Sequence, residues 1–178
     1  QKSQAILGTF RGSSIGQFLQ CVFRKSTKGG VISLENSQLL VDSCKVEEAT
    51  VEFNSTGEIN AIRGCTLEGN TEGLRTGITA GMNSIVRIVN NTIRSSIVDV
   101  KDQANVKLCD NNYTNSSLIV WGTGIAAADK ETFTGDCTRG AGYACGISES
   151  GSLTIRDSSF SNLNGFAIIS YDNSHCSV

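Results

Sequence analysis

The sequence lacks proline entirely, and its 178 residues include one histidine, one methionine, one tryptophan and only 6% aromatic residues. It has no apolar run near the roughly 18–20 residues that a membrane-crossing helix requires. The formal net charge is -2, so the basic excess that binds a phosphate backbone is missing. These absences argue against a membrane span and against nucleic acid as a partner.

Metal and cofactor binding also lack their usual signals. His175 is the single histidine, and no pair of cysteines has the C-x2-C spacing that is typical of zinc sites. We therefore expect no cofactor. What the chain does have is 19 glycines and frequent valine, isoleucine and threonine, a composition that favours many short strands joined by tight turns. Its length fits one domain.

A short phrase recurs along the chain: an apolar residue, two further residues, a small or amide residue, one residue, and a second apolar residue. The middle positions are Cys21, Cys44, Cys65, Asn91, Asn111 and Ser158, with a weaker copy at Glu131. These positions recur every 20 to 27 residues. A period that varies while the strand positions stay in phase indicates a parallel β-solenoid, because loops absorb the differences in length. The sequence thus predicts an all-β solenoid of about seven rungs.

The phrases VDSCKV, IRGCTL, IVNNTI and IRDSSF resemble the repeat of right-handed parallel β-helix proteins, the pectin-lyase-like family. The resemblance covers residues 18–178, with an inserted loop region expected at 121–145. Residues 1–17 do not fit the repeat, so we expect them to form an N-terminal cap. This architecture serves lyases, glycosidases, tailspikes and adhesins alike, so the resemblance implies a fold and leaves the activity open.

The middle positions are expected to form one inward-facing column, and the resemblance implies a ladder of stacked amides continued by the cysteines. A cysteine at such a corner acts as a small apolar residue. The alternative is a disulfide between adjacent rungs, because a spacing of about 4.8 Å lies within the range of Cα separations for such bonds. A carboxylate at Glu131 would be costly if buried, so that rung is expected to be either open to water or misaligned.

Other cysteines bracket a loop or stand apart. Cys137 and Cys145 flank the longest insertion between rungs and are candidates for a disulfide that restrains it. Cys109 and Cys176 remain, and the odd total of seven cysteines leaves at least one thiol unpaired within the chain.

Catalytic signals are weak. The hydrolases of the resembled family use phrases such as N-x-D, D-D, G-H-G and R-x-K, and none occurs here. Glu47, Glu48 and Glu68 should lie near Arg94 on one edge of the rod. They form a weak candidate for a calcium site of the kind used by pectate lyases, with simple solvated charges as the alternative.

Two further pairs of residues have a predicted role, one as an ion pair and one in binding a sugar. Asp42 should lie over Arg63 as a surface ion pair. Trp121 and Tyr143, in or beside the inserted loop region, could stack on a sugar ring.

Secretion is expected from the seven cysteines together with four N-x-S/T sequons. The candidate glycosylation sites are Asn54, Asn90, Asn112 and Asn115. The sequence stops at Val178 in mid-rung, so the last rung is expected to be covered by further rungs of a longer chain or by a second subunit.

These observations lead us to expect a non-catalytic, secreted β-helix that serves as a structural or adhesive extracellular element, such as a surface rod or a filament subunit. The alternative is a polysaccharide lyase or hydrolase, or a degenerate relative that binds carbohydrate. Expected partners are other copies or rungs of the same chain and carbohydrate.

Overall fold

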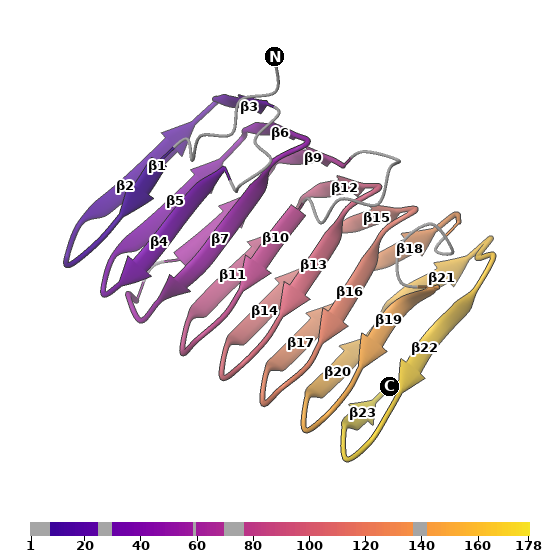
Figure 1. Ribbon diagram of the computed structural model, residues 1–178. Helices are drawn as coiled ribbons and strands as arrows, with labels where there is room; N and C mark the ends of the chain where they lie inside the picture. Colours follow the sequence, from indigo (N-terminus) through magenta and orange to yellow (C-terminus); the bar gives the residue numbers. More distant parts are fainter. Residues whose placement is uncertain (1–7, 25–29, 59, 70–76, 137–141) are drawn as a thin grey trace.

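The computed structural model describes residues 8–24, 30–58, 60–69, 77–136 and 142–178. These residues coil into a parallel β-solenoid of about seven turns, and the described part of the chain has no helix (Figure 1). Each coil contributes one strand to each of three parallel sheets, so strands that are three elements apart in the sequence are neighbours in space. The prediction of an all-β solenoid is confirmed.

Sheet 1 and sheet 2 each contain eight strands, and sheet 3 contains seven. Sheet 1 comprises β1 (Gly8–Phe10), β4 (Val31–Glu35), β7 (Thr50–Ser55), β10 (Gly77–Ala80), β13 (Ile97–Val100), β16 (Ser117–Val120), β19 (Tyr143–Ile147) and β22 (Phe166–Ser170). Sheet 2 comprises β2 (Ile15–Leu19), β5 (Gln38–Asp42), β8 (Asn60–Arg63), β11 (Ile85–Val89), β14 (Asn105–Cys109), β17 (Ile125–Asp129), β20 (Ser152–Arg156) and β23 (His175–Ser177). Sheet 3 comprises β3 (Val22–Arg24), β6 (Lys45–Glu47), β9 (Thr66–Glu68), β12 (Thr92–Arg94), β15 (Asn112–Thr114), β18 (Thr132–Thr134) and β21 (Ser159–Ser161).

The bend from sheet 2 to sheet 3 is made the same way in every coil. One residue adopts a left-handed conformation directly before the small or amide residue of the repeat, with φ between 47° and 61°. The seven residues are Gln20, Ser43, Gly64, Asn90, Asp110, Lys130 and Asp157. A left-handed residue turns the chain sharply without a loop, which lets the recurring six-residue phrase cross the corner in register.

The interior is a set of apolar columns. In sheet 2 the inward residues Val41, Ile62, Ile88 and Leu108 stack in register, and each is at most 1% exposed. Burying such a side chain contributes roughly 1.5–3 kcal/mol. In sheet 3 the rings of Tyr113, Phe133 and Phe160 stack with centroids 4.3 and 5.0 Å apart. The alternation of apolar and polar residues along short strands therefore builds a continuous core along the rod.

Two expected boundaries were wrong. The part of the expected cap (1–17) that the structure describes, residues 8–17, belongs to the first coil, because β1 and β2 pair with β4 and β5; residues 1–7 lie outside the described residues. The region 121–145 is not one inserted loop, because β17 and β18 lie within it and pair in register with β14 and β15 of the coil before. The added length lies between β18 and β19. The strand Ile125–Asp129 carries alanines at 126–128, so this coil gives only the weaker copy of the repeat that is centred on Glu131.

Candidate functional site

The predicted column of small and amide residues is a continuous hydrogen-bonded ladder. The backbone N–H of Asn91 donates to Oδ1 of Asn111 over 3.0 Å, and the N–H of Cys65 donates to Oδ1 of Asn91 over 2.9 Å. The N–H groups of Cys21 and Cys44 donate to the sulfur one coil further along, each over 3.3 Å. The side chain of each ladder residue thus accepts the N–H of the previous coil. The ladder is a structural element, because its side chains face the interior.

Glu131 is in this ladder, and neither expectation for it was right. Its side chain is buried, with the residue 1% exposed, and its Oε1 accepts from the backbone N–H and the Nδ2 of Asn111 over 3.3 and 3.2 Å. Burial raises the pKa of the Glu131 carboxyl to about 7, against the opposing effect of the Asn111 hydrogen bonds. Its Oε2 and the hydroxyl of Tyr113 are both buried, and the Tyr113 hydroxyl also acts to lower the pKa of the Glu131 carboxyl. A neutral carboxyl can take the place of an amide here, which is how the coil stays in register.

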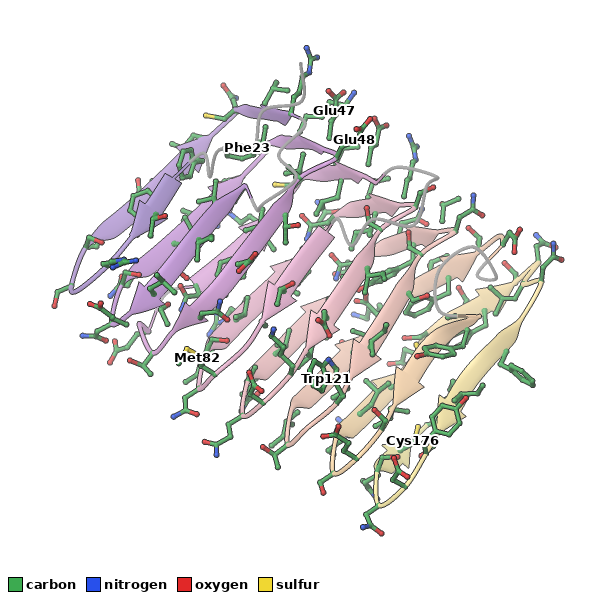
Figure 2. All side chains as sticks on the ribbon, viewed as in Figure 1. Phe23, Glu47, Glu48, Met82, Trp121 and Cys176 are labelled. Atoms are coloured by element: carbon green, nitrogen blue, oxygen red, sulfur yellow. The ribbon has the colours of Figure 1, made fainter. Side chains whose placement is uncertain are left out.

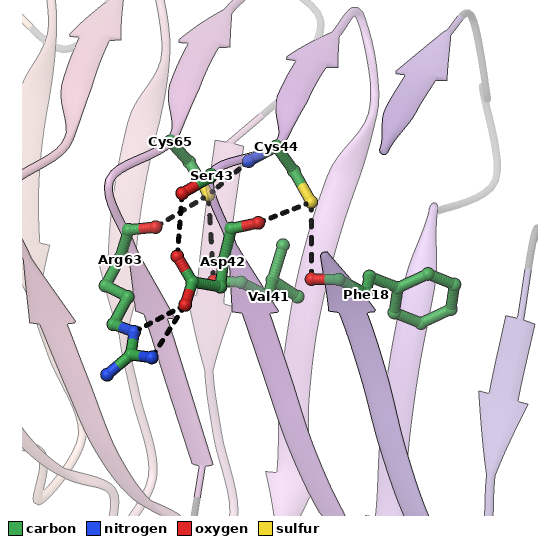
Figure 3. Close-up of polar contacts among 7 residues, drawn as sticks. All are labelled: Phe18, Val41, Asp42, Ser43, Cys44, Arg63 and Cys65. Carbon is green, nitrogen blue, oxygen red and sulfur yellow. Dashed lines mark hydrogen bonds and ion pairs between the residues drawn. The ribbon is translucent and has the colours of Figure 1, made fainter. Parts of the chain in front are cut away.

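The cysteines of the ladder are thiols in this structure. Cys21, Cys44 and Cys65 are free, so the alternative of a disulfide between their coils is not realised. Burial raises the pKa of the Cys65 thiol to about 12. Figure 3 shows the Cys44 and Cys65 sulfurs pointing toward backbone carbonyls of the neighbouring strands. Cys137 lies outside the described residues, so its pairing with Cys145 stays a prediction.

The acidic patch on sheet 3 consists of ion pairs. Glu47 contacts Arg24 and Lys45, while Glu68 contacts Lys45 and Arg94 over 3.4 and 3.6 Å. The Lys45 ammonium, followed by the Arg24 guanidinium, lowers the pKa of the Glu47 carboxyl. Among the described residues no group of three or more histidine, cysteine or acidic side chains is arranged to hold a metal ion.

The patch of Glu47, Glu48 and Glu68 therefore has the arrangement of a charge ladder and not that of a calcium site, because cationic side chains already satisfy two of the three carboxylates. Labels in Figure 2 place Glu47 and Glu48 together at the edge of the rod. The predicted pair of Asp42 and Arg63 is present as well, with Nη2 and Oδ2 2.6 Å apart (Figure 3). Hydrogen bonds from Arg63 and then Ser43 lower the pKa of the Asp42 carboxyl.

The aromatic residues singled out from the sequence, Trp121 and Tyr143, both belong to the sheet 1 side of the rod. Trp121 directly follows β16 and Tyr143 begins β19, the next strand of that sheet. The Tyr143 ring lies over Gly146, at a place where a Cβ would collide with it. Tyr171, which follows β22, is 51% exposed. Burial, and after it the charges of Tyr171 and Asp99, raises the pKa of the Tyr143 hydroxyl. The structure therefore brings Trp121, Tyr143 and Tyr171 from three successive coils to one side of the rod, and we call this set of residues the aromatic face.

Charged side chains adjoin the aromatic face. Asp99 in β13 accepts a hydrogen bond from the Trp121 indole, with Nε1 and Oδ1 2.6 Å apart. The Lys101 ammonium lies 5.9 Å from the centre of the Trp121 ring, in the position of a cation–π contact. Figure 2 shows Trp121 on the near face of the rod, at the end of β16. The indole is thus held in place from two sides by a carboxylate and an ammonium.

A second carboxylate, Glu52, shares the outward column of Asp99. The register runs from Glu52 through Thr79 to Asp99, so the two acids are two coils apart, or roughly 10 Å by the spacing of strands. Burial raises the pKa of the Glu52 carboxyl, and the charge of Lys101 opposes the shift. Its Oε2 also accepts a long hydrogen bond from Nδ2 of Asn54, 3.5 Å away.

The four sequons differ in accessibility. Asn90 and Asn112 are exposed on adjacent coils. Asn115 is half-buried, and its Oδ1 accepts from the backbone N–H of Asp136 over 2.7 Å. Asn54 is also half-buried, and its side chain packs over Gly81. The folded rod therefore presents Asn90 and Asn112 best for a glycan, and glycosylation itself stays a prediction.

Comparison with protein-family models, with curated proteins and with solved structures found no match to the chain. The described part of the chain contains no helix that is long and apolar enough to cross a membrane. We therefore infer the function from the geometry of the rod and of its outer face.

Sequence reasoning found Trp121 and Tyr143 but missed their neighbours. Asp99 lies in β13 between the buried residues Val98 and Val100, and this alternation of apolar and polar residues is a signal that could have placed it on the outer face. Nothing in the sequence indicates that Glu52 and Lys101 lie near Asp99 and Trp121, because this proximity depends on which strands stack in sheet 1. Tyr171 is 28 residues beyond Tyr143 and joins it only through the coiling.

Proposed function

We propose that this protein is a non-catalytic, secreted β-helical rod with an adhesive role, and that it binds carbohydrate through the aromatic face of sheet 1. The observation that supports this best is the grouping of Trp121, Tyr143 and Tyr171 on one outer face, beside Asp99 and Lys101. Flat aromatic rings pack against the apolar C–H faces of sugars, and nearby charged groups supply directed hydrogen bonds to hydroxyls.

Rigidity supports the same role. The aromatic face is built on neighbouring strands of a sheet, and the Trp121 ring is fixed by Asp99 and Lys101 before any ligand arrives. A site that is ordered in advance loses less entropy on binding. Repetition along a rod also allows a polymer to be held at several points, which suits adhesion more than turnover.

The test is a glycan array followed by titration calorimetry on the best ligand. Trp121→Ala and Tyr143→Ala should each weaken binding at least tenfold. Ile125→Ala is the matched control, because Ile125 is a large exposed side chain on sheet 2, 50% exposed, and should leave the affinity unchanged. Absence of binding across the array, with a folded protein, would contradict the proposal.

Secretion and glycosylation form a separate part of the proposal. Mass spectrometry of protein recovered from the medium of a eukaryotic host should find glycans on Asn90 and Asn112 and fewer on Asn115. Recovery of unmodified protein that stays inside the cell would count against this part alone.

A second candidate function is hydrolysis of a glycosidic bond. Inverting glycosidases place two carboxyls roughly 6.5–9.5 Å apart, one of them with a raised pKa, and the Glu52 and Asp99 column comes close to this arrangement. The hydrogen bonds of Asp99 to Trp121 and of Glu52 to Asn54 favour binding over catalysis. Release of reducing sugar that is abolished by Glu52→Gln would instead establish the enzyme.

Two finer points belong to the same proposal. We place the rod with the right-handed, pectin-lyase-like β-helices, on the support of the ladder at the tight bend. We also propose that the rod contacts other copies of itself or further coils of the same chain. Sedimentation at several protein concentrations tests the self-contact, and a constant monomer mass would contradict it.

A further inference from the structure

A long groove runs along the turns that connect sheet 1 to sheet 2. It has a volume of about 1100 Å³, and its lining includes one or more residues from each of seven successive coils, from Arg11 in the first to Glu149 in the seventh. Six steps between strands make it roughly 30 Å long. Because the groove crosses the coils, it is parallel to the rod axis. Its shape suits an extended chain better than a compact molecule.

Hydrogen-bonding side chains come to the walls from several coils, beside the apolar side chains of Leu34 and Met82. Amides are supplied by Asn36, Asn83 and Gln103, and a hydroxyl is supplied by Thr123. Amide groups both donate and accept hydrogen bonds, and so do hydroxyls. Such a repeated set matches a polymer that presents hydroxyl groups at regular intervals.

The charge of the groove restricts this polymer further. Three carboxylates from different coils line it, at Glu35, Asp102 and Glu149, whereas Arg11 at one end supplies the single positive charge of the lining. Glu35 accepts from the N–H of Gly12 over 2.8 Å and Asp102 from the N–H of Met82 over 3.2 Å, so these carboxylates are fixed in place. A row of fixed negative charge repels an acidic polymer.

The groove also adjoins the aromatic face. Gly122 lines the groove and directly follows Trp121, and φ at Gly122 is +67°. A side chain at this position would meet the backbone of Asp102 at 3.1 Å and would narrow the groove between Asp102 and Glu149. A ligand that lies in the groove can therefore reach the aromatic residues without leaving the rod.

From the shape, the hydrogen-bonding groups and the charge, we infer that this groove binds a linear glycan without acidic groups. The inference rests on the proposed carbohydrate binding, and it adds a second subsite and a ligand class. Polyuronates and sulfated glycans are disfavoured. An extended basic peptide shares the charge preference, but it lacks the dense hydroxyl groups that the amide row fits.

Titration calorimetry with hexasaccharides tests the ligand class. Hexamers of glucose, xylose, mannose and N-acetylglucosamine represent neutral chains, and a hexamer of galacturonic acid represents an acidic chain. At least one neutral hexamer should bind, and the acidic hexamer should bind at least tenfold more weakly at low salt. Equal or tighter binding of the acidic hexamer, or displacement of the neutral hexamer by a short lysine peptide, would overturn the inference.

Variants locate the site. Asn83→Ala combined with Gln103→Ala should weaken binding of the neutral hexamer at least tenfold, whereas Gln17→Ala, which removes an exposed amide from the outer face of sheet 2, should change it less than twofold. Glu35→Gln combined with Glu149→Gln keeps the hydrogen-bonding geometry and removes two charges. This variant should strengthen binding of the acidic hexamer at least threefold.

The outcomes separate the groove from the aromatic face. If Trp121→Ala abolishes binding while the double amide variant binds normally, the groove is not a subsite and the proposed function stands. If neither set of variants affects an observed affinity, both are wrong. If both sets weaken binding, one ligand occupies the groove and the face together, as inferred.

Discussion

The thiol end of the ladder and its amide part occupy the same corner of the rod but tie the coils together with different strength. Cys21 and Cys44 donate their N–H groups to sulfur over 3.3 Å, whereas Cys65 and Asn91 donate to amide oxygen over 2.9 and 3.0 Å. Sulfur is a weak acceptor, and an amide adds two donors of its own. The bend between sheet 2 and sheet 3 therefore accepts either a thiol or an amide side chain. The strength of the hydrogen bond between neighbouring coils depends on which of the two is the acceptor.

The amide part is also linked along the rod. Nδ2 of Asn91 donates to Oδ1 of Asn111 over 2.9 Å, and Nδ2 of Asn111 donates to the carbonyl of Ile88 over 2.8 Å. Each amide thus joins three successive coils. We expect the coils around Asn91 and Asn111 to open after those around Cys21 and Cys44 during unfolding, and the following substitutions test this difference.

Asn111→Ala should have the largest effect. It leaves the N–H of Asn91 and the carbonyl of Ile88 buried without their partners, and each such loss costs about 1–3 kcal/mol, so the free energy of unfolding should fall by about 3–5 kcal/mol. Urea denaturation measures it. Asn112→Ala is the control, because the exposed neighbouring amide should matter by less than about 0.5 kcal/mol. A loss below about 1 kcal/mol at Asn111 would show that the ladder is not a major tie.

Glu131 should make the free energy of unfolding depend on pH in the direction opposite to that of an ordinary carboxylate. Its pKa is raised from 4.5 to about 7, so between these values the folded state keeps a proton that the unfolded state has lost. Its contribution makes the free energy of unfolding fall as pH rises from about 4.5 to 7, by up to about 3 kcal/mol.

Denaturation at a series of pH values, with Glu131→Gln as the comparison, measures this contribution. The glutamine keeps the acceptor for Asn111 and removes the ionisation, so the variant should lose this part of the pH dependence and be more stable than the parent at pH 8. Identical pH profiles for parent and variant would contradict the buried location of the carboxyl.

Cys65→Ala should cost about 1–2 kcal/mol, which is less than Asn111→Ala. The change removes one buried sulfur and a weak acceptor for the N–H of Cys44. Urea denaturation of both variants under the same conditions gives the comparison directly. A cost equal to that of Asn111→Ala would mean that the two parts of the ladder do not differ in strength.

Cys65→Asn should have the smallest effect and sharpen the comparison most. It extends the amide ladder by one coil, so the gain in hydrogen bonding and the added volume should nearly cancel, leaving the free energy of unfolding within about 1 kcal/mol. Hydrogen exchange of the Cys44 N–H should nevertheless slow at least threefold. Faster exchange at Cys44 would show that the corner there is too narrow for an amide.

Most of the fold could be predicted, because the coil is a local repeat. The short phrases around Cys44, Cys65 and Asn91 each indicate a bend, an inward-facing residue and the strand that follows. The first coil and the alanine coil were harder to recognise. In the first coil, Phe10 lies too close in sequence to Phe23 for a full repeat. In the alanine coil, the small residue Ala128 stands at an inward position where other coils have a large apolar residue.

The candidate site was predicted only in part. Trp121 and Tyr143 were recognised as aromatic residues that could hold a sugar, but nothing in their spacing places Asp99 under the indole or Lys101 beside it. Those contacts connect coils 20 or more residues apart, and loops of different length decide which residues become neighbours. The proximity of Glu68 to Arg94 was predicted, whereas the contacts of Lys45 with Glu47 and Glu68 were not.

The sequence by itself determined the architecture of this protein, namely a stack of parallel coils with one column of small and amide residues at the tight bend. A bend and an alternating strand are encoded within about ten residues, so they can be read locally. Only the tertiary structure decided that three aromatic residues share a face, that a groove crosses seven coils, and that Glu131 is buried. These properties depend on the vertical alignment of residues from different coils, which arises only when the whole chain is wound.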